Sequence, residues 1–223
     1  MELYEVMRTA FSAREFTDDP VPDEVLHRII EHARFAPSGG NRQGAQLIVV
    51  RDAATKRAIA DLAVPAAKRY AAQRANGESP WNTIDPPRVT AEEIEATRAP
   101  AGLIEPTANA PVLLIVCVDL KVVASLDQYL DRVGVISGGS IYPFAWNILL
   151  AARNEGYGGT LTTMPIAEEP KLKALLGIPE HVAVAAVIPF GKPVQSLTKL
   201  RRRPVEEFTH LERWDGGALE ASS

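Results

Sequence analysis

The segment Ala36-Pro37-Ser38-Gly39-Gly40-Asn41-Arg42-Gln43 separates a strongly amphipathic helical pattern from a short apolar strand pattern. Pro37 cannot extend a helix and disfavours helical geometry in the residue before it, so the helix should stop here. The serine and glycines that follow leave backbone N–H groups free to bend around a ligand. Asn41 and Gln43 add amide side chains, each both donor and acceptor. A polar heterocyclic ligand would suit this loop, although an ordinary helix-to-strand turn explains the same residues equally well.

Composition limits the class of protein. The chain has 223 residues, which is compatible with one domain or two small ones, and we expect a single domain over residues 1–223. Hydrophobic residues make up 46% of the chain, which is enough for a core. The net charge of −4 gives no reason to expect a nucleic-acid or membrane partner. The single cysteine, Cys117, sits in an apolar run and is expected to be a buried hydrophobe. Because the N-terminal residues lack an apolar leader and no run is long enough to span a bilayer, we expect a cytoplasmic protein.

Apolar spacing predicts alternating helices and strands. The expected helices cover residues 3–11, 23–36, 53–63, 137–154 and 170–176, and the expected buried strands cover residues 46–50, 112–118 and 182–188. Asp23 is the expected N-cap of the second helix. Pro143 could kink the long helix, and Gly156 and Gly177 are in the positions of left-handed helix caps.

Two segments interrupt this pattern. Residues 65–109 are rich in proline and are predicted to form a lid-like insertion, with Tyr70 and Trp81 as candidate pocket walls. A surface excursion packed on the core is the alternative, and we favour it for most of these residues. Residues 199–216 carry large apolar side chains without a regular pattern: Phe208, Leu211 and Trp214. Such a tail is expected to dock, either on a partner chain or on its own domain.

The usual catalytic and metal-binding signatures are missing. The sequence contains no Cys-x-x-Cys, His-Glu-x-x-His, Gly-x-Ser-x-Gly or Walker motif. Residues 156–161 lack the third glycine of a dinucleotide fingerprint. His27 and His32 have the wrong spacing for one helical face, so we expect no metal site. We therefore assign no catalytic side chain.

Basic and hydroxyl residues instead gather in two places. Ser12 and Arg14 follow the first helix, and residues 201–203 form a triple arginine before Pro204. A guanidinium fork with a hydroxyl is a common phosphate site, although a solvated charged turn is the alternative for the triple arginine. Residues 158–163 form a glycine-rich entry to a β-like run, where the backbone could approach a flat ligand; an ordinary strand start is the alternative.

Taken together, these motifs resemble the nitroreductase family, whose members are FMN-dependent NAD(P)H oxidoreductases. The resemblance is carried, in order, by residues 11–16 with 20–22, 36–43, 156–163 and 201–207. It covers nearly the whole chain apart from residues 65–109. It implies an α+β fold with a central mixed β-sheet flanked by helices. It also implies a homodimer with FMN at the interface and the C-terminal tail docked on the partner.

The resemblance also implies site residues. Ser12 and Arg14 would reach the phosphate and the ribityl or pyrimidine edge of FMN, and Arg201 and Arg202 would hold the phosphate. The flavin would be lined by Ser38, Gly39, Asn41 and Gln43. Backbone contacts near the reactive ring, including a donor to flavin N5, would come from Leu161, Thr162 and Thr163.

The implied activity is hydride transfer from NAD(P)H to flavin N5, followed by ping-pong reduction of a nitroaromatic, a quinone or a similar small-molecule acceptor. Ala10 and Phe11 stand where the family often has an arginine, and Arg8 is a candidate replacement. Gly44 and Ala45 replace a bulkier family pair, which bears on substrate preference. A flavin-fragmenting or reductive dehalogenating enzyme, a flavin storage protein and a plain α/β interaction domain remain as alternatives.

Overall fold

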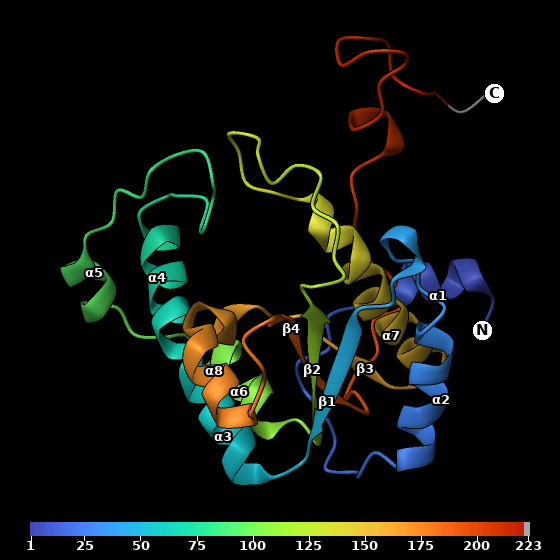
Figure 1. Cartoon of the computed structure of the whole chain (residues 1–223), viewed down its shortest axis with the longest axis vertical. Coiled ribbons are helices and arrows are strands. Elements are labelled where there is room, and N and C mark those ends of the chain that lie inside the picture. The colour runs from blue at the N-terminus through green and yellow to red at the C-terminus, as the bar shows by residue number, and fades with distance from the viewer. Residues whose placement is uncertain (221–223) are drawn as a thin grey trace.

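The computed structural model describes residues 1–220 and has a four-stranded sheet at its centre, in the order β1-β2-β4-β3 (Figure 1). The strands are β1 (Ala45–Val50), β2 (Val112–Asp119), β3 (Gly158–Gly159) and β4 (Val182–Gly191). All three ladders are antiparallel, and Ser12 forms an isolated parallel bridge with Gly159. The predicted α+β class is confirmed. The sheet, predicted to be mixed, is antiparallel in all its ladders, and within the described residues parallel pairing is confined to that bridge.

Helices cover both faces of the sheet (Figure 1). The α-helices are α1 (Leu3–Thr9), α2 (Asp23–Ala33), α3 (Ala53–Leu62), α4 (Val64–Ala75), α5 (Ala91–Ala96), α6 (Ala101–Asn109), α7 (Tyr142–Asn154) and α8 (Glu169–Leu176). Short 3₁₀ turns are η1 (Gly39–Asn41), η2 (Ile136–Ser140), η3 (Met164–Glu168) and η4 (Val205–Glu207). Helices α2 and α7 pack on one face and α3 and α8 on the other. Within residues 1–220, none of the helices has the length and apolarity needed to cross a membrane.

Strand β2 is buried on both faces, as predicted. Leu114 and Val116 belong to the core beneath α2 and α7, while Leu113 and Ile115 belong to the core beneath α3 and α8. Side chains of successive strand residues point to opposite faces, so an uninterrupted apolar run fills both cores. Residues 46–50 form a strand, as predicted, but the prediction that this strand is buried is wrong. Within residues 1–220, strand β1 pairs with β2 alone and is mostly half-buried, with Gln46 and Val49 exposed, because it lies at the edge of the sheet.

Two predicted helix starts differ from the structure. Pro22 is the N-cap of α2, and Asp23 is the first helical residue, whose carboxylate pairs with Arg51 at 2.6 Å. The predicted helix at residues 137–154 is divided into η2 and α7. Pro143 therefore lies in the first turn of α7, where its missing N–H costs nothing, and it causes no kink. Gly156 and Gly177 have φ of 80° and 65°, which confirms the predicted left-handed helix ends.

Residues 65–109 do not behave as one unit. Helix α6 packs on α3, with Ile104 and Thr107 buried, so it is part of the core. Helices α4 and α5 and the loop between them extend past the end of the sheet (Figure 1). The lid role predicted for the whole segment can apply only to this outer part.

The C-terminal segment, residues 199–220, extends away from the body (Figure 1). Every hydrogen bond described for residues 201–220 joins two residues of that segment, for example Leu211 N to Gly217 O at 2.8 Å. Phe208 and Trp214 are 51% and 87% exposed. The structure therefore does not have the segment docked on its own domain, which was one of the two expectations.

Candidate functional site

The segment that carries Ser12 and Arg14 is attached to strand β3. The backbone N–H of Ala13 donates to the carbonyl of Gly159 at 3.0 Å, next to the Ser12–Gly159 bridge. This attachment brings Arg14 beside residues 161–163, which follow β3 in the chain. Arg14 and these residues line a cavity of about 210 Å³, together with Tyr70 from α4 and several residues of α6. Two motifs far apart in sequence thus meet at one site.

Gly159 lies too close to strand β4 to carry a side chain. A Cβ atom at this position would lie 2.6 Å from the carbonyl oxygen of Pro189 and 2.8 Å from Cγ2 of Ile188. The space in front of Gly159 is therefore filled by β4. At Gly159 the close approach is therefore between two strands, as in the alternative of an ordinary strand start.

The backbone of residues 161–163 is only partly available to a ligand. The N–H of Thr162 donates to Val187 O at 2.9 Å, and the carbonyl of Thr162 accepts from Val187 N at 2.9 Å. Both backbone groups of Thr162 are therefore paired with Val187 in this structure. Within residues 1–220, the N–H groups of Leu161 and Thr163 have no acceptor. These two amides and the Arg14 guanidinium are the candidate donors of the cavity.

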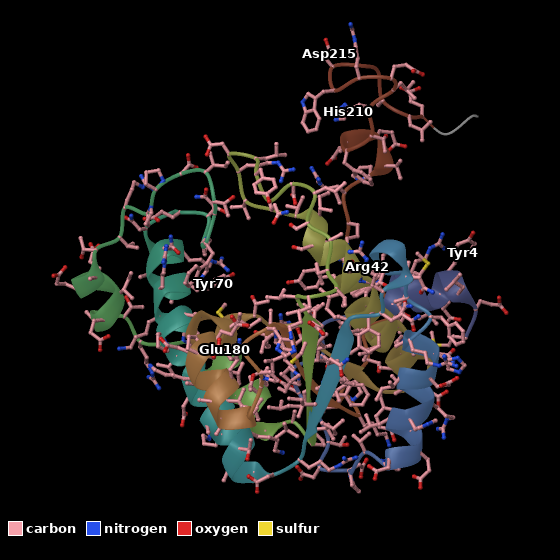
Figure 2. All side chains as sticks on the ribbon, viewed as in Figure 1. Tyr4, Arg42, Tyr70, Glu180, His210 and Asp215 are labelled. Atoms are coloured by element: carbon pink, nitrogen blue, oxygen red, sulfur yellow. The ribbon has the colours of Figure 1, made fainter. Side chains whose placement is uncertain are left out.

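A larger and more apolar cavity of about 560 Å³ adjoins the first. The two share Tyr70, Thr163 and Met164. The remaining walls are aromatic or aliphatic: Ala66, Trp81, Tyr142, Ile166, Ala167, Val184 and Ala185. Figure 2 shows Tyr70 on the flank of α4 that faces the sheet. The combined site has a polar end at Arg14 and an aromatic end at Trp81, a combination typical of small-molecule sites.

The floor of the apolar cavity is a β-bulge. Val116 faces Ala186 and Cys117 faces Val184, so Ala185 is an extra residue in β4. The N–H of Val184 donates to Glu169 Oε1 at 2.7 Å, and the carbonyl of Ala185 accepts from the Tyr142 hydroxyl at 3.3 Å. Side chains from α8 and α7 thus satisfy backbone groups at the bulge. Bulges of this kind are common beside active sites.

The loop between α4 and α5 is organised by Glu78, whose side chain is 7% exposed. It accepts hydrogen bonds from Asn76 Nδ2 at 2.8 Å, Gln73 Nε2 at 3.1 Å and the backbone N–H groups of Arg88 and Val89. These bonds, that from Asn76 foremost, hold the pKa of Glu78 below its usual range. The loop that carries Trp81 is therefore closed on a buried carboxylate.

Residues 36–43 form a tightly bent loop elsewhere on the surface. Gly39 N donates to Ser140 Oγ at 3.1 Å, and Gln43 N donates to Ser38 Oγ at 2.9 Å. Asn41 and Gln43 have φ of 53° and 51°, an uncommon conformation for residues other than glycine. Ser38 and Gln43 line a separate hollow of about 300 Å³. Arg42 of this loop and Tyr70 lie on opposite sides of β2 in Figure 2.

The predicted phosphate cluster is not assembled within one chain. Arg201 and Arg202 belong to the extended C-terminal segment, where Arg202 Nη1 donates to the Arg201 carbonyl at 2.7 Å. Neither arginine lines the cavity that contains Arg14. The structure thus brings together Arg14, Leu161, Thr162 and Thr163, with Ser12 adjacent, and leaves the other predicted residues apart.

Comparison with known proteins identifies the family of the chain. The model of the nitroreductase family matches residues 7–192. The chain belongs to the nitroreductase family. A relative named NADH dehydrogenase, from Thermus thermophilus, is 28% identical over 87% of this chain and 88% of its own length.

Two solved structures share the nitroreductase fold. An NADPH:FMN oxidoreductase from Vibrio harveyi, complexed with NAD⁺, has a TM-score of 0.68 at 21% identity and covers 95% of this chain and 77% of that one. An iodotyrosine deiodinase bound to FMN and 3-iodo-L-tyrosine has a TM-score of 0.64 at 22% identity. It covers 92% of this chain and 96% of that one. The predicted nitroreductase-like fold is thereby confirmed.

Sequence reasoning missed three contributors to the site of this nitroreductase-family protein. Tyr142 was hidden in a helix predicted to begin at residue 137, and Glu169 carried no motif. Gln73, 2% exposed, looked like an ordinary polar helix residue. A signal existed only for Tyr142, which precedes a proline at a helix start. The roles of Glu169 and Gln73 depend on backbone groups in other elements.

Proposed function

We propose that the protein is an FMN-dependent oxidoreductase that uses NAD(P)H to reduce a small electron-poor acceptor such as a nitroaromatic or a quinone. The observation that carries this proposal is the meeting of Arg14 with the unpaired N–H groups of Leu161 and Thr163, beside an aromatic cavity. The names of the family relatives, an NADH dehydrogenase and an NADPH:FMN oxidoreductase, support it.

The donor set suits FMN. When bound, FMN accepts reducing equivalents from NAD(P)H and delivers them to the acceptor, so the protein needs no acid–base pair of its own. Arg14 supplies a permanent positive charge, which favours a group that becomes more negative during the reaction. The N–H groups of Leu161 and Thr163 can donate to polar ring atoms. The apolar walls line the space where the nicotinamide and the acceptor would alternate.

We extend the proposal to a homodimer in which residues 36–43 and the C-terminal segment complete the site of the partner copy. This arrangement explains why one chain leaves the residues 36–43 loop and Arg202 apart from Arg14. Exposed aromatic side chains are available for such an interface: Tyr142, Trp146, Phe208 and Trp214. In this proposal, α4, α5 and their connecting loop cover the site, and the protein is cytoplasmic.

The dimer is tested by sedimentation velocity on the full chain and on a variant truncated after residue 198. The full chain should sediment as a dimer and retain FMN, and the truncated variant should lose FMN affinity. A monomeric full chain that retains FMN would contradict the dimer.

Reductive dehalogenation is a second candidate on the same scaffold, favoured by the fold shared with an iodotyrosine deiodinase. The aromatic walls of the apolar cavity suit halogenated aromatics as well as nitroaromatics. Release of halide from halophenols under reducing conditions, measured against reduction of nitroaromatics by the same preparation, decides between the two. A flavin storage protein would show neither reaction.

The deciding experiment is the visible absorption spectrum of the purified protein, repeated anaerobically after NADPH or NADH is added. Flavin bands that bleach with either nucleotide are the expected result. Flavin bands that persist with both nucleotides would favour the storage alternative. A protein without flavin, even after reconstitution with FMN, would overturn the proposal.

A further inference from the structure

Trp81 is held in an unusual conformation at the edge of the apolar cavity. Its φ of 58° lies in the left-handed region, where a bulky side chain is a rare outlier. Such residues persist only where the surrounding structure holds them, and they cluster at ligand sites. The indole is 42% exposed and lines the 560 Å³ cavity. Its conformation is therefore not explained by burial of its own ring.

Gln73 holds the backbone of Trp81 in place. Its Oε1 accepts from the Trp81 N–H at 3.2 Å, while its Nε2 donates to Glu78 Oε2 at 3.1 Å. Gln73 is buried within α4, so this bridge ties the loop to a rigid helix. The ring is thereby positioned before any ligand arrives, which reduces the entropy lost on binding.

Arg69 lies over one face of the Trp81 indole. Its Cζ lies 4.1 Å from the centroid of the Trp81 ring, a cation–π contact. Arg69 is not among the residues that line the cavity. The Nε of Arg69 is buried and has no hydrogen-bond partner. Among residues 1–220, Arg69 forms no ion pair. A positive charge without an ion-pair partner among residues 1–220 therefore lies against the Trp81 wall of the cavity.

No charged side chain is among the residues that line the cavity, and the Glu169 carboxylate accepts from the N–H of Val184 at the floor. Tyr70, Tyr142 and Met164 contribute aromatic and thioether surface. Flat aromatic molecules fit such walls by stacking. The field of Arg69 disfavours a cation at this place and tolerates a neutral molecule or an anion.

We propose that Trp81, backed by Arg69 and held by Gln73, is the specificity-determining wall of the acceptor site, and that the acceptor is a planar aromatic molecule that is neutral or anionic. The oxidoreductase role of this acceptor rests on the proposed function. The binding preference does not, because it can be measured without turnover.

The first test uses tryptophan fluorescence of the FMN-reconstituted protein in which Trp146→Phe and Trp214→Phe leave Trp81 as the only indole. The probes are 4-nitrobenzoate, menadione and the cation N-methyl-4-nitropyridinium. We expect saturable quenching by the first two, with a dissociation constant at least about tenfold weaker for the cation. Calorimetry on the same protein supplies independent constants. Binding seen by calorimetry without quenching of Trp81, or equal affinity for anion and cation, would overturn the proposal.

The second test compares variants. Trp81→Ala should weaken 4-nitrobenzoate about tenfold, whereas Trp81→Phe, which keeps a flat ring, should bind within about threefold of the parent. Arg69→Met should reduce the preference for the anion over the cation, a change that loss of structure alone would not produce. Unchanged affinity in both Trp81 variants would refute the assignment. Flavin bleaching by NAD(P)H is measured separately, so failure of the oxidoreductase function remains distinguishable from failure of the binding preference.

Discussion

The backbone N–H of Ala13 donates a hydrogen bond to the carbonyl of Gly159 at 3.0 Å and joins the N-terminal segment to the edge of the sheet. This single contact positions Arg14 beside residues 161–163, which no local interaction could achieve. Because Gly159 also pairs with β4, the geometry of the polar cavity depends on a residue without a side chain.

Gly159→Ala should lower the free energy of unfolding by about 1–3 kcal/mol, the usual cost of overpacking. The added Cβ would meet Pro189 O and Ile188, so β3 or β4 must shift. Urea unfolding followed by circular dichroism measures the change. Gly102→Ala in α6 is the control, since a Cβ there has no atom within 4 Å. Equal stability of the two variants would contradict this account.

Arg14→Ala should weaken FMN retention about ten- to hundredfold, the cost of losing a hydrogen bond from a charged group. It should also slow flavin bleaching by NAD(P)H, because the positive charge at the site is lost. Fluorescence titration of the apoprotein with FMN and anaerobic stopped-flow absorbance measure the two effects. Arg8→Ala, an exposed arginine on α1, is the matched comparison. If Arg8→Ala has the larger effect, Arg8 fills the role assigned to Arg14.

Asp127 should make stability depend on pH in the acid range. The N–H of Val135, donating at 2.7 Å, is the main cause that lowers the pKa of this carboxyl to about 2, with Arg132 at 2.8 Å also contributing. A depressed pKa stabilises the fold above the ordinary value of 3.8, and this stability is lost as pH falls toward 2. Unfolding midpoints measured between pH 5 and about 2 should show a steep fall that Asp127→Asn reduces. The exposed Asp131, changed to Asn, should leave the profile unaltered.

Cys117 should not react with thiol reagents in the native protein. It is 2% exposed, and burial raises its pKa to about 11, so little thiolate exists at neutral pH. Labelling with Ellman's reagent at pH 8 should be negligible in buffer and should reach one thiol per chain in denaturant. Rapid labelling of the native protein would show that strand β2 is accessible, contrary to its position in both cores.

The sequence by itself determined the local elements of this protein. The apolar periods of α2 and α3, the uninterrupted run of β2 and the left-handed ends at Gly156 and Gly177 all follow from properties of neighbouring residues. The order of the glycine-rich and basic motifs also sufficed to predict the family.

The tertiary structure decided what depends on partners distant in the chain. The partial exposure of β1 follows from its place at the sheet edge, and the β-bulge at Ala185 follows from the register between β2 and β4. The N–H of Ala13 binds the carbonyl of Gly159, and the N–H of Trp81 binds the side chain of Gln73. Neither pairing has a signal in the sequence. Backbone hydrogen bonds are chemically alike at every residue, so only the folded arrangement determines which of them build a site.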